Sequence, residues 1–129
     1  MVEIASGVCV HLLDPMPGVV VTRVTDGLRE RGHRVELRGD SLAASEAQLT
    51  ANAILGHFRA DRDVTDVYLT SRPLASVTGD PIHGIASRAH RSAIVGIPTT
   101  SEHERFRPEV ASRVLDLVLR ELGRLQHDD

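Results

Sequence analysis

Short runs of β-branched residues alternate with segments of helical spacing along this chain, and this alternation restricts its fold more than any other feature. The first apolar run covers residues 2–13 and is interrupted near its start by small residues. It predicts a buried strand, best defined over residues 8–13. Two prolines within residues 14–18 end the strand, because a proline cannot donate a hydrogen bond to a strand ladder.

Helical spacing replaces the strand pattern immediately afterwards. Val20, Val24 and Leu28 fall on one face of a helix, with charged residues on the other. Gly32 stands where a helix commonly ends in a left-handed residue. The pattern therefore predicts a helix up to Gly32, followed by a short strand over residues 33–37.

A second helix and a third strand are predicted in the middle of the chain. Ser45 precedes Gln48 by three residues, which is the spacing of a capping box. Apolar residues recur at helical spacing behind it, so we expect a helix over residues 44–59. Residues 64–71 are rich in β-branched types and predict the next strand.

The last part of the chain predicts a hairpin and a long helix. Two apolar runs, residues 82–86 and 93–98, are separated by a short polar segment, which favours a hairpin whose first strand lies at the sheet edge. Apolar residues from Phe106 to Leu125 then recur every three or four positions. Pro108 suits the first turn of the amphipathic helix that they predict.

Together these elements predict an α/β fold. We expect residues 1–129 to form a single α/β domain, with a mixed, mostly parallel sheet of about five strands and three helices. The longest apolar stretches are far shorter than the ~20 residues of a membrane helix, and the first residues lack the charged region of a signal peptide. No membrane segment is expected, and the prediction is a soluble cytoplasmic domain or a soluble piece of something larger.

All 15 basic residues are arginine, and the chain contains no lysine. This excludes a lysine nucleophile, a Schiff-base lysine and a P-loop lysine. The 18 acidic residues give a net charge of −3, which argues against a nucleic-acid or anionic-membrane surface. Cys9 is the one cysteine, so an internal disulfide, a Cys-x-x-Cys redox pair and a multi-cysteine zinc site are excluded.

Ligands of open α/β sheets bind beyond the carboxyl ends of the strands. Asp14, Thr70 and Arg72 follow the first and third strands and are the candidate ligand-binding residues. Arg72 suits a carboxylate or phosphate, although such residues are also common in solvated loops. Residues 99–101 follow the last strand and add hydroxyl groups. Neither a Gly-x-Gly-x-x-Gly motif nor a phosphate-binding loop motif occurs, so no cofactor is predicted.

The seven histidines do not predict a metal site, because no two of them are four residues apart. His11 lies in an apolar strand and is expected to be an interior histidine, and Cys9 beside it is expected to be buried and unreactive. His83, His90 and His103 lie in or near the hairpin, where they could converge. No Gly-x-Ser-x-Gly motif is present, and no catalytic residue is predicted.

The final helix contains the segment Arg120-Glu121-Leu122-Gly123-Arg124. It resembles the active-site helix of metzincin zinc peptidases, particularly archaemetzincins, in which two histidines flank Glu-Leu-Gly. Both histidine positions hold arginine here, and arginine does not release its proton to bind Zn²⁺. The preceding segments, residues 65–70 and 93–97, also look like that family. The resemblance implies a metzincin-like domain without zinc ligands, whereas the alternative is simply an arginine-rich end of an amphipathic helix.

A second resemblance covers about residues 64–120. Residues 69–74, 79–82 and 93–98 resemble a segment of uncharacterised actinobacterial proteins, which tend to combine such a region with later membrane helices. That resemblance implies no catalytic residues. The absence of lysine suits a GC-rich source, because GC-rich codons favour arginine.

The leading hypothesis is a non-catalytic α/β domain of unknown role that acts through protein contacts. The alternative is a small-molecule or nucleotide-binding domain, or an enzyme of that class, in which Asp14, Thr70 and Arg72 line one pocket. A homo-oligomer is a third hypothesis, formed through the apolar stripe of the last helix and an edge strand near Ile82.

Overall fold

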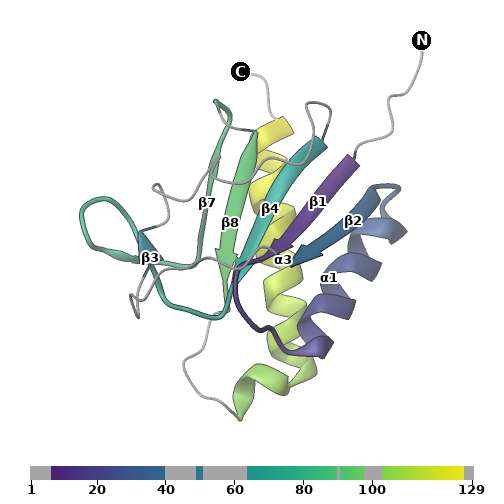
Figure 1. Cartoon of the computed structure of the whole chain (residues 1–129), viewed down its shortest axis with the longest axis horizontal. Helices are drawn as coiled ribbons and strands as arrows, with labels where there is room; N and C mark the ends of the chain where they lie inside the picture. The colour runs from purple at the N-terminus through teal and green to yellow at the C-terminus, as the bar shows by residue number, and fades with distance from the viewer. Residues whose placement is uncertain (1–6, 40–48, 51–63, 90, 98–102, 127–129) are drawn as a thin grey trace.

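A five-stranded sheet forms the centre of the computed structural model, which describes residues 7–39, 49–50, 64–89, 91–97 and 103–126 (Figure 1). Its strand order is β2-β1-β4-β8-β7. The strands are β1 (Gly7–Leu12), β2 (Arg34–Gly39), β4 (Val64–Thr70), β7 (Gly84–Ser87) and β8 (Ser92–Gly96). The first four in spatial order are parallel, and β7 pairs antiparallel with β8 at the edge. The predicted mixed, mostly parallel sheet of five strands is therefore confirmed.

Two α-helices, α1 (Gly18–Glu30) and α3 (Pro108–Gln126), lie on one face of this sheet (Figure 1), and a 3₁₀ helix, η1 (Glu104–Phe106), precedes α3. The described residues thus contain two α-helices rather than the three predicted. The helix predicted over residues 44–59 lies outside the described residues except at Leu49–Thr50, which form strand β3. At these two residues the prediction is wrong, because Leu49 and Thr50 pair in parallel with residues 74–75 of a distant strand. None of the described helices is both long and apolar enough to span a membrane.

A second, smaller sheet was not predicted. It has the order β3-β5-β6, with β5 at Leu74–Ala75 and β6 at Pro81–Ile82. The run predicted as one strand over residues 82–86 is divided between β6 and β7, so the edge strand of the main sheet begins at Gly84 and not near Ile82. Strands of two residues carry no readable alternation, which is why the sequence did not reveal them.

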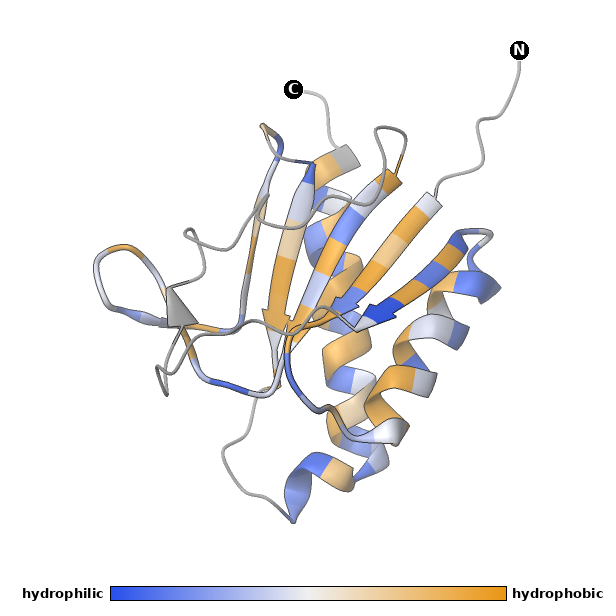
Figure 2. Cartoon of the chain, in the orientation of Figure 1, coloured by the Kyte–Doolittle hydropathy of each residue, from blue (hydrophilic) through white to orange (hydrophobic). Residues whose placement is uncertain are grey.

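The core lies between the main sheet and the two helices. Val8 and Val10 of β1 and Val67 and Leu69 of β4 pack there against apolar residues of both helices. Figure 2 shows apolar positions along the central strands and on both helices. The apolar stripe of α3 is thereby used within the fold, with Val114, Leu115, Val118 and Leu122 all buried.

The opposite face of the central strands is buried as well. Successive strand residues point to opposite faces, so Cys9 and His11 of β1 and Asp66 and Tyr68 of β4 point away from the two helices. Each of these four side chains is at most 1% exposed. Burial on both faces is usual for parallel strands, but here it encloses a thiol, an imidazole and a carboxylate.

Candidate functional site

The three residues predicted as ligand-binding come together at the carboxyl edge of the sheet. The Thr70 hydroxyl donates to Asp14 Oδ2 at 2.5 Å, and Arg72 Nε lies 3.8 Å from the same oxygen. Ser71 joins them, since its backbone N–H and its hydroxyl both donate to Asp14 Oδ1, at 2.7 and 2.6 Å. These side chains lie together because β1 and β4 are adjacent parallel strands, while the prediction that they line one ligand pocket stays a prediction. Residues 99–101, also considered, lie outside the described residues.

The polar groups of this cluster form hydrogen bonds with one another. Both oxygens of Asp14 accept hydrogen bonds, the carboxylate is only 7% exposed, and the Thr70 hydroxyl also accepts from the Arg72 N–H at 3.0 Å. These bonds tie the loop after β1 to the loop after β4. A ligand here stays a prediction, because a bound group would compete with bonds that the protein already makes.

A second polar group surrounds Glu121 near the end of α3. The Glu121 side chain is fully buried, with Oε2 3.2 Å from Arg120 Nη2 and Oε1 3.2 Å from Arg124 Nη1. The two arginine side chains are about half exposed, at 52% and 58%. Both guanidinium groups therefore reach from the surface to the carboxylate beneath them, and Arg124 Nη1 donates to both of its oxygens.

These residues do not fit a zinc ion. A guanidinium has only N–H donors and no lone pair for a metal. Zinc in proteins is bound by cysteine, histidine or carboxylate groups, so within Arg120–Arg124 the one suitable ligand is Glu121, and both its oxygens already face arginines. A zinc centre of the metzincin layout has no donor set on this helix.

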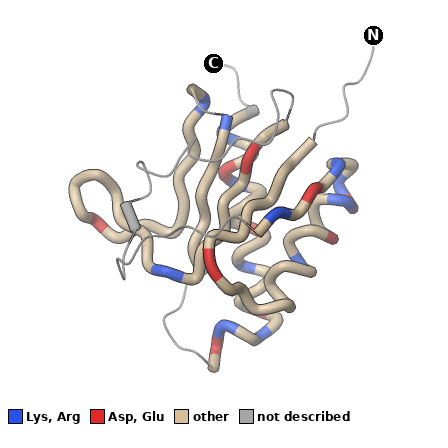
Figure 3. Tube along the Cα trace, in the orientation of Figure 1, with Lys and Arg blue, Asp and Glu red and all other residues tan. Residues whose placement is uncertain are grey.

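A pocket of about 200 Å³ opens at the amino ends of the central strands. The Asp14 cluster lies at the other, carboxyl end of the same strands. The lining of the pocket is basic and apolar: Val8, His33, Thr65, Arg88, Arg91, Leu122 and Leu125. Arg88 Nε donates to the Arg124 carbonyl at 3.2 Å, which joins this pocket to the arginines around Glu121. Figure 3 shows the basic positions at the turn between β7 and β8, where Arg91 adopts a left-handed backbone with φ 49°.

Three of the histidines considered individually in the sequence lie within the described residues. His11 is interior as predicted, and its ring lies 5.0 Å from that of Tyr68. His83 and His103 are exposed, and His90 lies outside the described residues. Convergence of these last three histidines is therefore not tested.

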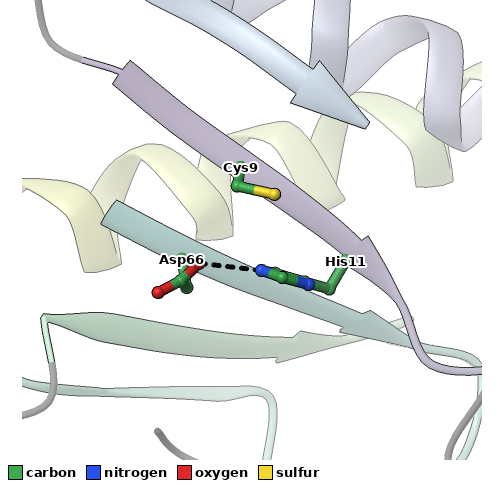
Figure 4. A group of neighbouring side chains, drawn as sticks. All are labelled: Cys9, His11 and Asp66. Carbon is green, nitrogen blue, oxygen red and sulfur yellow. Dashed lines mark hydrogen bonds and ion pairs between the residues drawn. The ribbon is translucent and has the colours of Figure 1, made fainter. Parts of the chain in front are cut away.

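A buried group of Cys9, His11 and Asp66 went unrecognised in the sequence (Figure 4). The donor atoms of the three side chains lie within 4.8 Å of one another, and His11 Nε2 is 2.8 Å from Asp66 Oδ1. The only local signal was the two-residue interval between Cys9 and His11, which places both on one face of a strand. Asp66 is added by the pairing of β1 with β4, where it stands opposite Cys9.

Comparison with known proteins identifies the fold. No protein-family model matches the chain, and no curated protein matches its sequence. Among solved structures, the archaemetzincin of Methanopyrus kandleri matches with a TM-score of 0.75 at 22% identity, over 94% of this chain and 73% of that one. The archaemetzincin of Archaeoglobus fulgidus, complexed with malonate, matches with a TM-score of 0.73 at 17% identity, over 95% and 79%. A zinc-dependent peptidase of Methanocorpusculum labreanum matches with a TM-score of 0.71 at 16% identity, over 92% and 80%.

The chain therefore has a metzincin-like fold, in agreement with the resemblance seen in its last helix. At these identities the likeness concerns the fold alone. The comparisons give no support to the resemblance to actinobacterial proteins, which stays a prediction.

Proposed function

We propose that this chain is a non-catalytic domain built on the fold of zinc peptidases, and that it acts by binding an acidic segment of another protein. The observation that carries the proposal is the group around Glu121. Arginines stand at both positions where the resemblance expects zinc ligands, and each is paired with the buried glutamate. A carboxylate held in this way is a structural counter-ion and is poorly suited to activate water.

The chemistry of the surface favours an acidic partner. Arg88, Arg91, Arg120 and Arg124 are exposed around the end of α3, whereas the carboxylate among them, Glu121, is buried. Arginine pairs with carboxylates through a planar, multidentate donor array. Leu122 and Leu125 line the adjoining pocket and would contact the aliphatic part of an acidic side chain.

A second copy of the chain is a weaker candidate for the partner. The oligomer hypothesis depends on the apolar stripe of α3 and on an edge strand near Ile82, and the stripe is buried against the sheet and α1. Binding at a carboxyl-edge pocket is also less favoured, since the Asp14 cluster satisfies its own polar groups.

The absence of peptidase chemistry is tested by incubating the full chain with Zn²⁺ and a mixed library of peptides, followed by mass spectrometry. We expect no cleavage by the native chain or by Glu121→Gln. Zinc-dependent cleavage that disappears in Glu121→Gln would overturn the proposal, because it would assign Glu121 a catalytic role.

Partner recognition is tested by fluorescence anisotropy with a labelled oligoglutamate peptide. We expect R88Q/R91Q to weaken binding about tenfold, equivalent to about 1.4 kcal/mol, and added salt to weaken binding by the native chain. R23Q/R29Q is the matched control, since it removes the same charge from exposed positions on α1. Equal weakening by both pairs would mean that only net charge matters, and no binding by the native chain would reject an acidic partner.

A further inference from the structure

The buried group of Cys9, His11 and Asp66 lies on the two central strands of the sheet, on the face turned away from α1 and α3 (Figure 4). Cys9 and His11 are two residues apart on β1, and Asp66 on β4 is the cross-strand partner of Cys9. All three donors are therefore fixed by regular strand geometry and do not depend on a loop. This group is separate from the arginines around Glu121, which lie on α3 beneath the other face.

The distances suit a small tetrahedral ion. Zinc bonds of about 2.3 Å to sulfur and about 2.0 Å to nitrogen or oxygen place neighbouring ligand atoms roughly 3.3–3.6 Å apart. The three donor atoms are already within 4.8 Å of one another. The 2.8 Å separation between His11 Nε2 and Asp66 Oδ1 would widen by about half an ångström. Binding therefore requires rotations of these side chains about their χ bonds.

The charges also balance. The Asp66 side chain is 0% exposed, so an ion bound here would lie in the interior, where opposite charges interact strongly. The Asp66 carboxylate and a Cys9 thiolate carry two negative charges, which a divalent ion neutralises while His11 stays neutral. Binding releases the thiol proton to solvent, and no redox change is involved.

We propose that Cys9, His11 and Asp66 form a binding site for Zn²⁺. A thiolate, an imidazole and a carboxylate are the ligand types that zinc takes, and a thiolate argues against Mg²⁺ or Ca²⁺, which prefer oxygen ligands. A tetrahedral ion takes its fourth ligand from outside this group. Because the three ligands are buried between central strands, the ion has a structural role, joining β1 to β4, and is not catalytic.

The test uses the full chain produced in cells grown with added Zn²⁺ or Co²⁺, so that the ion enters during folding. Native mass spectrometry is expected to find one zinc per chain, and the cobalt-loaded protein is expected to show a thiolate-to-cobalt charge-transfer band. Cys9→Ala should abolish that band, and both Cys9→Ala and His11→Gln should weaken retention of the ion against a chelator by at least about tenfold. Alanine at position 9 keeps the site apolar and small, so this variant is expected to fold.

His83→Gln is the matched control, because His83 is an exposed histidine outside the group. It should leave the ion and the charge-transfer band unchanged. The proposal is overturned if the native chain carries no metal, if the cobalt spectrum lacks the thiolate band, or if Cys9→Ala retains the ion as the native chain does.

The proposed zinc site and the proposed function are tested by independent experiments. Loss of zinc from Cys9→Ala should not change binding of the oligoglutamate peptide, which depends on the arginines near α3. Conversely, zinc-dependent peptide cleavage that requires Glu121 would overturn the proposed function without bearing on the Cys9 site.

Discussion

Asp14 illustrates at the scale of a residue how one side chain joins two loops of the sheet. Its 7% exposed carboxylate accepts hydrogen bonds from Thr70 and Ser71. Asparagine has the same shape, but one of the two acceptor oxygens is replaced by an NH₂ group. This group is a donor and cannot accept a hydrogen bond from Thr70 or Ser71. We expect Asp14→Asn to lower the free energy of unfolding by about 1–3 kcal/mol, measured by urea denaturation.

Asp26→Asn is the control for this substitution. Asp26 is 55% exposed and lies 3.8 Å from Arg29 in a surface pair, so we expect a change within about 0.5 kcal/mol. Equal losses in both variants would show that the bonds to Asp14 contribute nothing beyond the general effect of removing a charge.

At the scale of the element, the packing of α1 on α3 depends on a glycine. A Cβ atom placed on Gly27 would lie 2.5 Å from Leu115 Cδ2, and Leu115 is 2% exposed. Overpacking costs about 1–3 kcal/mol, against a gain of about 1 kcal/mol in helix propensity. We therefore expect Gly27→Ala to lower the midpoint temperature of thermal unfolding, measured by circular dichroism.

Gly123→Ala provides the matched comparison, because it makes the same change in α3 where no neighbouring atom lies within 4 Å of the added Cβ. Here the propensity gain of up to about 1 kcal/mol should be realised, and the thermal midpoint should rise. If both alanine variants raised the midpoint alike, the close contact between the two helices would not require a glycine at position 27.

At the scale of the whole molecule, the chain has a metzincin-like fold whose last helix carries arginine at positions 120 and 124. The TM-scores of 0.71–0.75 against archaemetzincin-type structures arise at identities of 16–22%. Arginine at positions 120 and 124 is compatible with this architecture, because both side chains are about half exposed. Val118 and Leu122, on the buried side of the helix, preserve the packing.

Local periodicity was sufficient to predict most of the elements. The strand predicted best over residues 8–13 is observed at Gly7–Leu12, and the helix entered through Pro108 is observed at Pro108–Gln126. Such patterns succeed because they record which face of an element is buried. The second sheet escaped prediction because its two-residue strands are held by pairing with one another and carry no period of their own.

The sequence by itself determined the α/β class, the edge hairpin and the absence of zinc-binding side chains at positions 120 and 124. Each of these depends on residue type or on short-range order along the chain. Only the tertiary structure decided that Cys9, His11 and Asp66 meet in the interior, because 55 residues separate His11 from Asp66 and the register of β1 against β4 joins them. Register is a property of two paired strands, and neither strand encodes it alone.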